Sequence, residues 1–268
     1  MNDRPESNDS QLARQAECGI ARRSATLIAR GLADVERPVK DILAAILDGD
    51  LHAVQEILRR DIASVEEACD HPDYIVGLRP LHFVALSNSV AIGARAEMTK
   101  LLLAAGADVN SRDSEGATPL HYVDEPSICE LLISGGADVN ARDNAGATPL
   151  HRAAEYPTTI HAPTFGPFEQ VVGILVAADP AINAQQSDGQ TALHRAAHWG
   201  SLPIVKSLLS AGAALTIRDN DGRTPYDVAV KRADRKAWNW WPQEVGNRFR
   251  LACLEVALFL KERADVAP

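Results

Sequence analysis

The chain has 268 residues, of which 27 are basic and 36 acidic, so its formal net charge is −9. A general nucleic-acid binder carries a surplus of basic residues, and this balance therefore argues against that class. The four cysteines lie far apart without a CxxC pair, which excludes a dense disulfide scaffold and gives no zinc knuckle. No segment has the apolar length of a signal peptide or a membrane span, and we expect a soluble cytoplasmic protein.

Residues 1–38 show only weak helical periodicity, and we expect a partly ordered extension there. Residues 44–58 then carry the apolar pattern of a helix pair but lack the turn motif that recurs further along the chain. The first unit of a repeat array has no neighbour on its N-terminal side. This segment is therefore predicted to cap the array.

A six-residue motif follows and recurs along the chain. Four copies begin at Gly77, Gly116, Gly146 and Gly189 and end in Leu-His, and a fifth begins at Gly222 and ends in Asp227. Successive motif glycines are 39, 30, 43 and 33 residues apart. In Thr-Pro-Leu-His the threonine can cap a helix, and proline suits the first helical position. Each copy is therefore predicted to begin a short helix.

The segments between these motifs also share an order. An alanine-rich stretch is followed by a leucine- and valine-rich one that ends at a glycine, as at Gly106, Gly136 and Gly212. An Asp-x-x-Gly stretch with the composition of a tight hairpin turn precedes three of the motifs. The repeating unit is therefore predicted to be a turn, two helices and an exit loop.

This order resembles the ankyrin repeat family, from about residue 39 to the C-terminus. The resemblance implies an all-α solenoid of stacked ankyrin-type helix-turn-helix repeats with short β-hairpin turns. Residues 39–268 would then hold about six repeats, including N- and C-terminal caps. It also implies that the motif histidines hydrogen-bond within and between the turns, and that partners bind along the concave face.

Two departures from the regular spacing are specific to this chain. Residues 155–168 contain three prolines, which forbid a continuous helix and predict a loop between the two helices of one repeat. We expect at least one of Tyr156, Phe165 and Phe168 to fold back onto the stack, with a partner contact as the alternative. Residues 122–127 belong to a shortened repeat, which predicts the loss of about one helical turn and a bend.

The closing repeat is interrupted at residues 231–247. It is predicted to resume as an apolar helix from Phe249 to Leu260 that seals the open end of the stack. We expect Trp238, Trp240 and Trp241 to cover that end, with a protein contact as the alternative.

The recurring motif histidines are candidate metal ligands by residue type. Equivalent positions in stacked repeats are roughly 10 Å apart, whereas zinc ligands converge to about 2 Å from one ion. His194 and His198 have helical spacing, but no HExxH motif surrounds them. Phosphate-binding glycine loops, nucleophile elbows and kinase motifs are also missing from the sequence. We therefore predict no catalytic residue, no metal site and no cofactor.

Partner-binding positions follow from placing the chain on the ankyrin pattern, at the hairpin tips and on the exposed side of the first helices. They include arginine, tyrosine and tryptophan, which often dominate binding energy at interfaces. For Trp199, packing against the first helix of the neighbouring repeat is the alternative. The predicted positions are Arg112, Glu115, Tyr122, Arg142, Asn144, Arg152, Tyr156, Asp188, Gln190, Arg195, His198, Trp199, Asp221 and Arg223.

The predicted function is a non-catalytic protein–protein interaction module or scaffold. Its partner would be another protein, for which the negative net charge favours basic character, and neither nucleic acid nor a membrane. Two alternatives remain open. One is a dedicated inhibitor or immunity-type protein that blocks an enzyme or toxin; the other is an enzyme that uses the C-terminal segment or the loop at 155–168.

Overall fold

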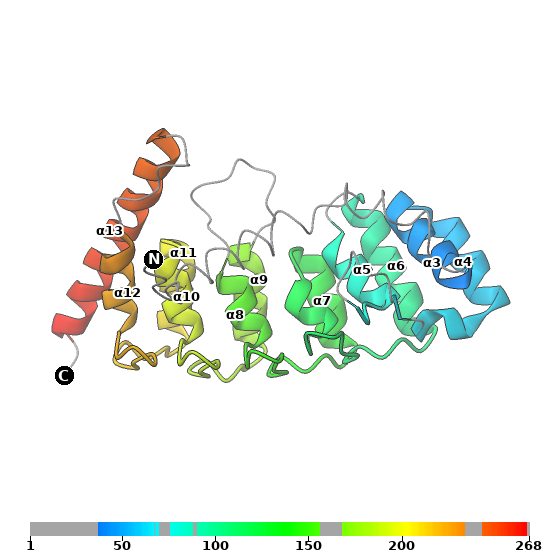
Figure 1. Ribbon diagram of the computed structural model, residues 1–268. Helices are drawn as coiled ribbons and strands as arrows, with labels where there is room; N and C mark the ends of the chain where they lie inside the picture. The colour runs from blue at the N-terminus through cyan, green and yellow to red at the C-terminus, as the bar shows by residue number, and fades with distance from the viewer. Residues whose placement is uncertain are drawn as a thin grey trace, which may run out of the picture. The chain divides into compact units, whose positions relative to one another are not determined.

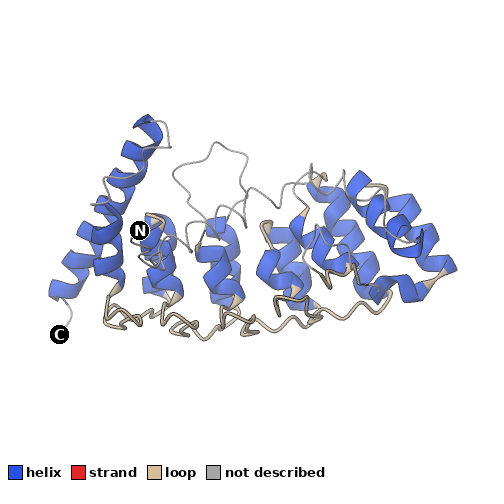
Figure 2. Ribbon diagram, viewed as in Figure 1, coloured by secondary structure: helices blue, strands red, loops and turns tan. Residues whose placement is uncertain are grey.

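The structure, a computed structural model, describes residues 37–66, 68–69, 76–87, 90–155, 168–233 and 243–266 (Figure 1). Within these ranges the chain forms helices joined by turns and loops and contains no strand (Figure 2). One isolated antiparallel bridge joins Cys69 and Leu78. The chain divides into two compact units, Met1–Ala107 and Asp108–Pro268.

The described part of the first unit contains four α-helices and one 3-10 helix. They are α3 (Arg37–Asp48), α4 (Leu51–Arg60), η2 (Ile62–Glu66), α5 (Pro80–Leu86) and α6 (Ile92–Ala104). Their apolar faces meet in a core to which α3, α5 and α6 contribute the side chains that are least exposed. These are Ile42, Leu43, Ile46, Leu81, Phe83, Met98 and Leu102.

The end of α5 is closed by a buried arginine from α6. Arg95 donates from Nε to the carbonyl oxygen of Val84 at 3.0 Å and from Nη2 to that of Ala85 at 2.8 Å. The last carbonyls of a helix have no partner within the helix. Because a guanidinium presents several donors in a fixed plane, one side chain satisfies two of them and links both helices of the pair.

The second unit alternates short and long helices in two layers (Figure 1). The inner layer comprises η3 (Pro119–Tyr122), α8 (Pro149–Ala154), α10 (Ala192–His198) and α12 (Pro225–Ala233). The outer layer comprises α7 (Pro126–Ser134), α9 (Phe168–Ala177), α11 (Leu202–Ser210) and α13 (Gln243–Val266). Consecutive helices of each layer contact one another. This arrangement confirms the predicted all-α repeat solenoid.

The predicted hairpins form as turns at one edge of the second unit. In the first of them, the amide of Asp113 donates to the Ala117 carbonyl at 3.1 Å, and Gly116 donates to the Asp113 carbonyl at 3.0 Å. Gly116 has a φ of 73°. A Cβ there would also lie 2.5 Å from Oδ1 of Asn144 in the next hairpin. Glycine is therefore needed for the turn and for the close approach of its neighbour.

Several details differ from the sequence expectation or fall outside the described ranges. The shortened repeat has the 3-10 helix η3 in place of an α-helix, and α7 begins only at Pro126. Phe168, expected in a loop, is the buried first residue of α9. The expected helix from Phe249 to Leu260 extends six residues further at each end, as α13. Residues 1–36 and 156–167, with Tyr156 and Phe165, and residues 234–242, with the three tryptophans, lie outside the description.

Candidate protein-binding surface

Each motif histidine in the second unit joins its own helix start to the next hairpin. Nδ1 of His121 accepts the backbone N–H of Thr118 at 3.0 Å, and its Nε2 lies 3.1 Å from the Ala147 carbonyl oxygen. Because Nδ1 accepts, Nε2 carries the proton and donates to that carbonyl. The corresponding Nε2 contacts run from His151 to Gln190 and from His194 to Arg223. The structural role expected of these histidines is confirmed.

Burial keeps these rings neutral. Removal from water lowers the pKa of His121 and of His151 to about 4, and it also lowers the pKa of His194. No cluster of three or more His, Cys, Asp or Glu side chains suited to a metal ion occurs in the described part of the chain. The motif histidines therefore act as neutral hydrogen-bonding groups between repeats.

The last motif shows why its histidine can be replaced. Oδ2 of Asp227 accepts the backbone N–H of Thr224 at 2.8 Å and the threonine hydroxyl at 2.7 Å. These hydrogen bonds lower the pKa of the Asp227 carboxyl. A carboxylate can cap the helix in this way but has no proton to donate onward. Aspartate in place of histidine therefore fits the last motif because, among the described residues, no further hairpin follows it whose carbonyl would need a donor.

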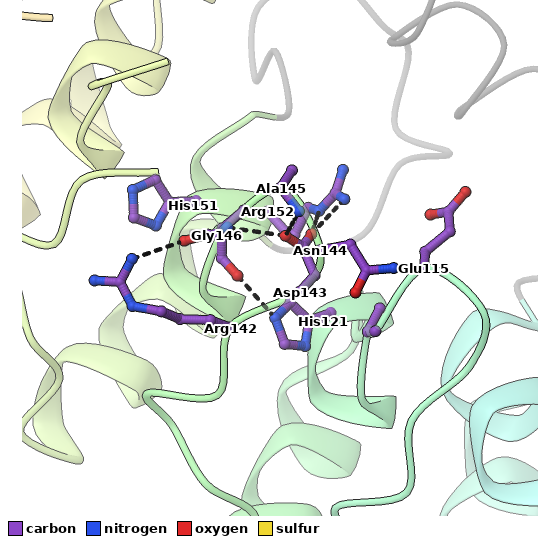
Figure 3. A network of polar contacts seen from close by, with 12 residues as sticks. Glu115, His121, Arg142, Asp143, Asn144, Ala145, Gly146, His151 and Arg152 are labelled. Atoms are coloured by element: carbon purple, nitrogen blue, oxygen red, sulfur yellow. Dashed lines mark hydrogen bonds and ion pairs between the residues drawn. The ribbon is translucent and has the colours of Figure 1, made fainter. Parts of the chain in front are cut away.

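Three of the four hairpins in the second unit are built around a buried aspartate, Asp113, Asp143 or Asp219, and Gln186 takes this position in the fourth. Figure 3 shows the hairpin of Asp143. Oδ1 of Asp143 accepts the backbone N–H groups of Ala145 and Ala147, both at 2.9 Å. Its Oδ2 accepts Nη2 of Arg152 at 2.6 Å and Nε at 3.2 Å. One carboxylate that is 1% exposed thus shapes the turn and also fixes an arginine of the following inner helix.

The partner of the second carboxylate oxygen varies from repeat to repeat. Asp113 accepts the hydroxyl of Tyr122, and Asp219 accepts Nε of Arg223 at 2.9 Å. Tyr122 is therefore 8% exposed, and its hydroxyl is used inside the chain. The structure thus revises the expectation that Tyr122 faces a partner, because the hydroxyl binds the buried aspartate of its own hairpin.

A second series of bonds ties successive hairpins together. Nη1 of Arg112 donates to the carbonyl oxygens of Gly116 at 2.7 Å and of Arg142 at 2.6 Å. Nη1 of Arg142 repeats this pattern toward Gly146 at 3.2 Å and Gln185 at 2.9 Å. At the tips, Nδ2 of Asn144 donates to the Ser114 carbonyl at 3.0 Å. The side chains of Arg112, Arg142 and Asn144 are nevertheless exposed.

The inner helices add a row of alternating charges. Glu155, at the end of α8, forms an ion pair with Arg195 of α10 and lies 3.8 Å from Nη1 of Arg152. The side chains of Arg152, Glu155 and Arg195 are 26%, 18% and 12% exposed. With Asp143 they form a continuous chain of opposite charges that spans two repeats.

The predicted positions separate by exposure. Those exposed are Arg112, Glu115, Arg142, Asn144 and Asp221, and those half-buried are Arg152, Asp188, Arg195, His198 and Arg223. Three others, Tyr122, Gln190 and Trp199, are buried. Tyr156 lies outside the described residues.

Trp199 lies in a different place from the one expected. It is 9% exposed, and its ring packs edge-on against Phe249 of α13, with 6.2 Å between ring centroids. The Arg232 guanidinium lies 5.6 Å from the Trp199 ring centroid. Trp199 thus joins the end of α10 to the C-terminal helix and, through Arg232, to α12, the inner helix of the neighbouring repeat. This contact fits the alternative of packing against the neighbouring first helix, and the burial of Trp199 does not fit a place on the partner surface. Gln190 is 3% exposed and is therefore likewise no part of the candidate surface.

Sequence reasoning missed Glu155 and the dual role of Asp143. The Asp-x-x-Gly pattern predicts only a turn. Nothing in it indicates which distant side chain the second carboxylate oxygen of the aspartate will bind. Glu155 follows Arg152 by three residues, a spacing that brings side chains together on a helix. That spacing was the available signal.

Comparison with known families gives matches over most of the repeats. The family model described as ankyrin repeats (3 copies) matches residues 42–143 and 90–161, and the model described as ankyrin repeats (many copies) matches residues 175–229. The chain belongs to the ankyrin repeat family. Ankyrin repeats are generally protein–protein interaction modules, and the family is generally non-catalytic.

Two further findings concern this ankyrin repeat chain. A search of curated proteins returned no match. Among the helices that the structure describes, none combines the length and apolar character needed to cross a bilayer.

Proposed function

We propose that this chain is a non-catalytic protein-binding module whose partner contacts the concave side formed by its hairpin tips and inner helices. The contact set, called here the hairpin surface, consists of the predicted positions that the structure leaves at least partly exposed. They are Arg112, Glu115, Arg142, Asn144, Arg152, Asp188, Arg195, His198, Asp221 and Arg223.

The observation that carries this proposal is that ion pairs within the chain hold in place arginine side chains that a partner can still reach. Arg152 is held by Asp143, and Arg195 by Glu155, yet both arginine side chains retain some exposed area. Ordering a flexible side chain on binding costs roughly 0.5–1.5 kcal/mol. Side chains that the fold already holds in place avoid much of that cost, which favours a binding role.

The net charge of −9 supports a basic partner. The exposed carboxylates of Glu115 and Asp221 lie at the hairpin tips, where such a partner would meet them. The same charge also suits a dedicated inhibitor of a basic enzyme or toxin. One stoichiometric partner is expected of an inhibitor, and several partners are expected of a scaffold.

A reducing compartment, and hence the cytoplasm, is the proposed location. Cys129 and Cys253 are buried and form no disulfide among the residues that the structure describes. Burial raises the pKa of Cys129 and of Cys253 to about 12, so neither forms a reactive thiolate near neutral pH. Extracellular proteins more commonly pair their cysteines.

The proposal is tested with two variants of equal charge change. Glu115→Lys/Asp221→Lys alters the hairpin tips, whereas Glu130→Lys/Glu169→Lys alters exposed positions on outer helices α7 and α9. Proteins captured by cross-linking to each full-length variant are quantified by mass spectrometry. We expect a specific partner to be lost from the tip variant and retained by the outer-helix variant. Retention by the tip variant, or equal loss from both, would contradict the proposal.

A further inference from the structure

The hairpin at residues 186–190, called here the Gln186 hairpin, differs from the other three in the second unit. In those three, a buried aspartate accepts the backbone N–H of the residue four positions later, as Asp143 accepts that of Ala147 at 2.9 Å. In the Gln186 hairpin, Oδ1 of Asp188 accepts the N–H of Gln190 at 2.8 Å instead. The carboxylate has thus moved two residues along the turn, from a buried position to a half-buried one.

The arginine that follows this hairpin also has a different partner. Arg152 is held by the aspartate of its own hairpin, nine residues earlier. The residue nine positions after Gln186 is Arg195, and it pairs with Glu155 of the preceding repeat. Gln186 is therefore a neutral amide in the place of a carboxylate. Asp188 and Glu155 take over the two kinds of bond that the carboxylate forms in the other hairpins.

This exchange leaves two buried amide oxygens without a hydrogen-bond donor. Gln186 is 8% exposed and Gln190 is 3% exposed, and Oε1 of each accepts no hydrogen bond within the described part of the chain. Nε2 of Gln186 donates to Oδ2 of Asp188 at 3.0 Å, which holds that amide in place. Burying an acceptor without a donor costs free energy. A ligand that donates to these oxygens would recover that cost without displacing an existing bond.

The two amides lie together beneath the hairpin surface. Side chains four residues apart meet in such a hairpin, as Asp219 and Arg223 do at 2.9 Å. Gln186 and Gln190 have the same spacing and close the same turn, because the Gln186 N–H donates to the Gln190 carbonyl oxygen at 3.0 Å. Asp188, a half-buried member of the hairpin surface, accepts a hydrogen bond from each of them. The amides are therefore placed directly below that surface.

The charge at this place favours a cation. The row of charges that ends at Arg195 contains the carboxylates of Asp143 and Glu155 and two guanidinium groups, so it is balanced. Asp188 adds a further carboxylate, which leaves one negative charge. A positively charged hydrogen-bond donor therefore fits better than an anion. Because the amide oxygens are buried, the donor must stand at the tip of a long, slender side chain, as it does in lysine and arginine.

We propose that the Gln186 hairpin holds a subsite for a basic side chain of the partner protein, which donates hydrogen bonds to Oε1 of Gln186 and of Gln190. Asp188 supplies the compensating charge. The inference rests on the proposed function, because it assigns the partner chemistry of one part of the hairpin surface. The other three hairpins of the second unit lack this subsite, since their aspartates use both carboxylate oxygens within the chain.

The first test titrates the isotope-labelled full-length chain with short peptides and follows the side-chain amide signals of Gln186 and Gln190 by NMR. Each peptide is acetyl-Gly-Gly-X-Gly-Gly-amide, where X is lysine, arginine, or norleucine, which has the lysine stem without the amine. Titration to about 10 mM detects dissociation constants in the millimolar range. We expect saturable shifts of both amide signals with at least one basic peptide and none with the norleucine peptide. The two basic peptides show which cation the subsite prefers.

A second test separates the subsite from general attraction between charges. Gln186→Asp restores the aspartate of the other hairpins, whose carboxylate would bind the Gln190 N–H and Arg195. Although this variant is more negative, we expect it to bind the basic peptides at least about fivefold more weakly, because its oxygens are used within the chain. Attraction by net charge alone predicts tighter binding.

A third variant removes one acceptor. Gln190→Ala introduces the residue found at the equivalent positions 117 and 147, so the hairpin should be retained. It should also weaken binding of the basic peptides at least about fivefold. The matched control is Gln170→Ala, at an exposed position of α9, which should leave binding unchanged. Circular dichroism of each variant establishes that it is folded.

Any of three results would overturn the proposal. Neither basic peptide could produce a saturable shift, the norleucine peptide could produce an equal one, or Gln186→Asp or Gln190→Ala could bind the basic peptides as tightly as the wild-type chain. The captured partner keeps the proposed function distinct. A partner lost from the hairpin-tip variant, with no peptide binding, would reject the subsite and support the hairpin surface. Peptide binding without any captured partner would support the subsite and contradict the proposed function.

Discussion

Within the second unit, the hairpin turns and the C-terminal helix both join one repeat to the next, but they use different chemistry. At the hairpins, buried aspartates and histidines bind backbone groups, as Asp143 binds Ala145 and Ala147. At α13, the contact is mainly apolar, with Phe249 packed against Trp199. Backbone geometry recurs from hairpin to hairpin, so a buried aspartate recurs at three of them, Asp113, Asp143 and Asp219. The contact between Trp199 and Phe249 needs only matching shape.

This difference has a consequence for stability. Hydrogen-bonded hairpin residues are intolerant of any change that leaves a buried polar group unpaired. The apolar residues of α13 include buried ones, such as Phe249 and Cys253, and exposed ones, such as Leu251 and Leu258. Substitutions can therefore compare polar bonding, apolar packing and exposed surface within one protein.

The largest loss in the free energy of unfolding is expected from a substitution at the apolar contact of α13. Phe249→Ala removes a fully buried ring that contacts Trp199 and lies 5.2 Å from the Arg232 guanidinium. The expected loss is about 4 kcal/mol in the free energy of unfolding, because a cavity replaces the ring. Urea denaturation measures it. A loss below about 1 kcal/mol would show that α13 does not seal the stack.

The next largest effect is expected at the hairpins. Asp143→Ala removes the acceptor of two backbone N–H groups and of Arg152. We expect about 3 kcal/mol of destabilisation, because buried donors lose their partner. Asp221→Ala, at an exposed hairpin position, is the control and should change the free energy of unfolding by less than about 0.5 kcal/mol. Equal effects of the two substitutions would contradict the role given to Asp143.

A smaller effect per residue is expected from the protonation of the buried histidines. The pKa of His121 and of His151 is about 4 in the folded chain, below the ordinary value of about 6.5. The unfolded chain therefore binds more protons between these values, and stability falls as the pH drops from about 6.5 toward 4. Each histidine should contribute a loss of about 2 kcal/mol between pH 7 and pH 4.5. In urea denaturation, His121→Gln/His151→Gln should weaken this pH dependence; an unchanged slope would contradict it.

The smallest effect on folding is expected at the exposed leucines. Leu251→Gln/Leu258→Gln should change the free energy of unfolding by less than about 0.5 kcal/mol, since both side chains already face solvent. Urea denaturation measures the change. A large loss would mean that these leucines pack within the chain.

The sequence predicted the hairpins well because their requirements are local. Proline, threonine and histidine at fixed spacing indicated where the inner helices begin, and α8 and α10 begin as expected. Gly116 indicated a turn that only glycine can form without strain. The repeat architecture followed from the recurrence of these local signals.

The candidate site was predicted only in part because exposure depends on distant residues. Trp199 was expected at a partner surface, yet Phe249, fifty residues later, covers it. Tyr122 was expected to be accessible, yet its hydroxyl binds Asp113. The exposed leucines of α13 resembled ordinary core positions, since spacing alone does not reveal which of two apolar faces is buried.

The proposal that the hairpin surface binds a protein partner is tested most directly by affinity. Isothermal titration calorimetry of the captured partner compares Glu115→Lys/Asp221→Lys with the charge-matched Glu130→Lys/Glu169→Lys. The tip variant should bind at least about tenfold more weakly than the wild-type chain, a loss of about 1.4 kcal/mol, while the outer-helix variant binds as the wild type does. Equal affinity of both variants for the partner would contradict the proposed surface.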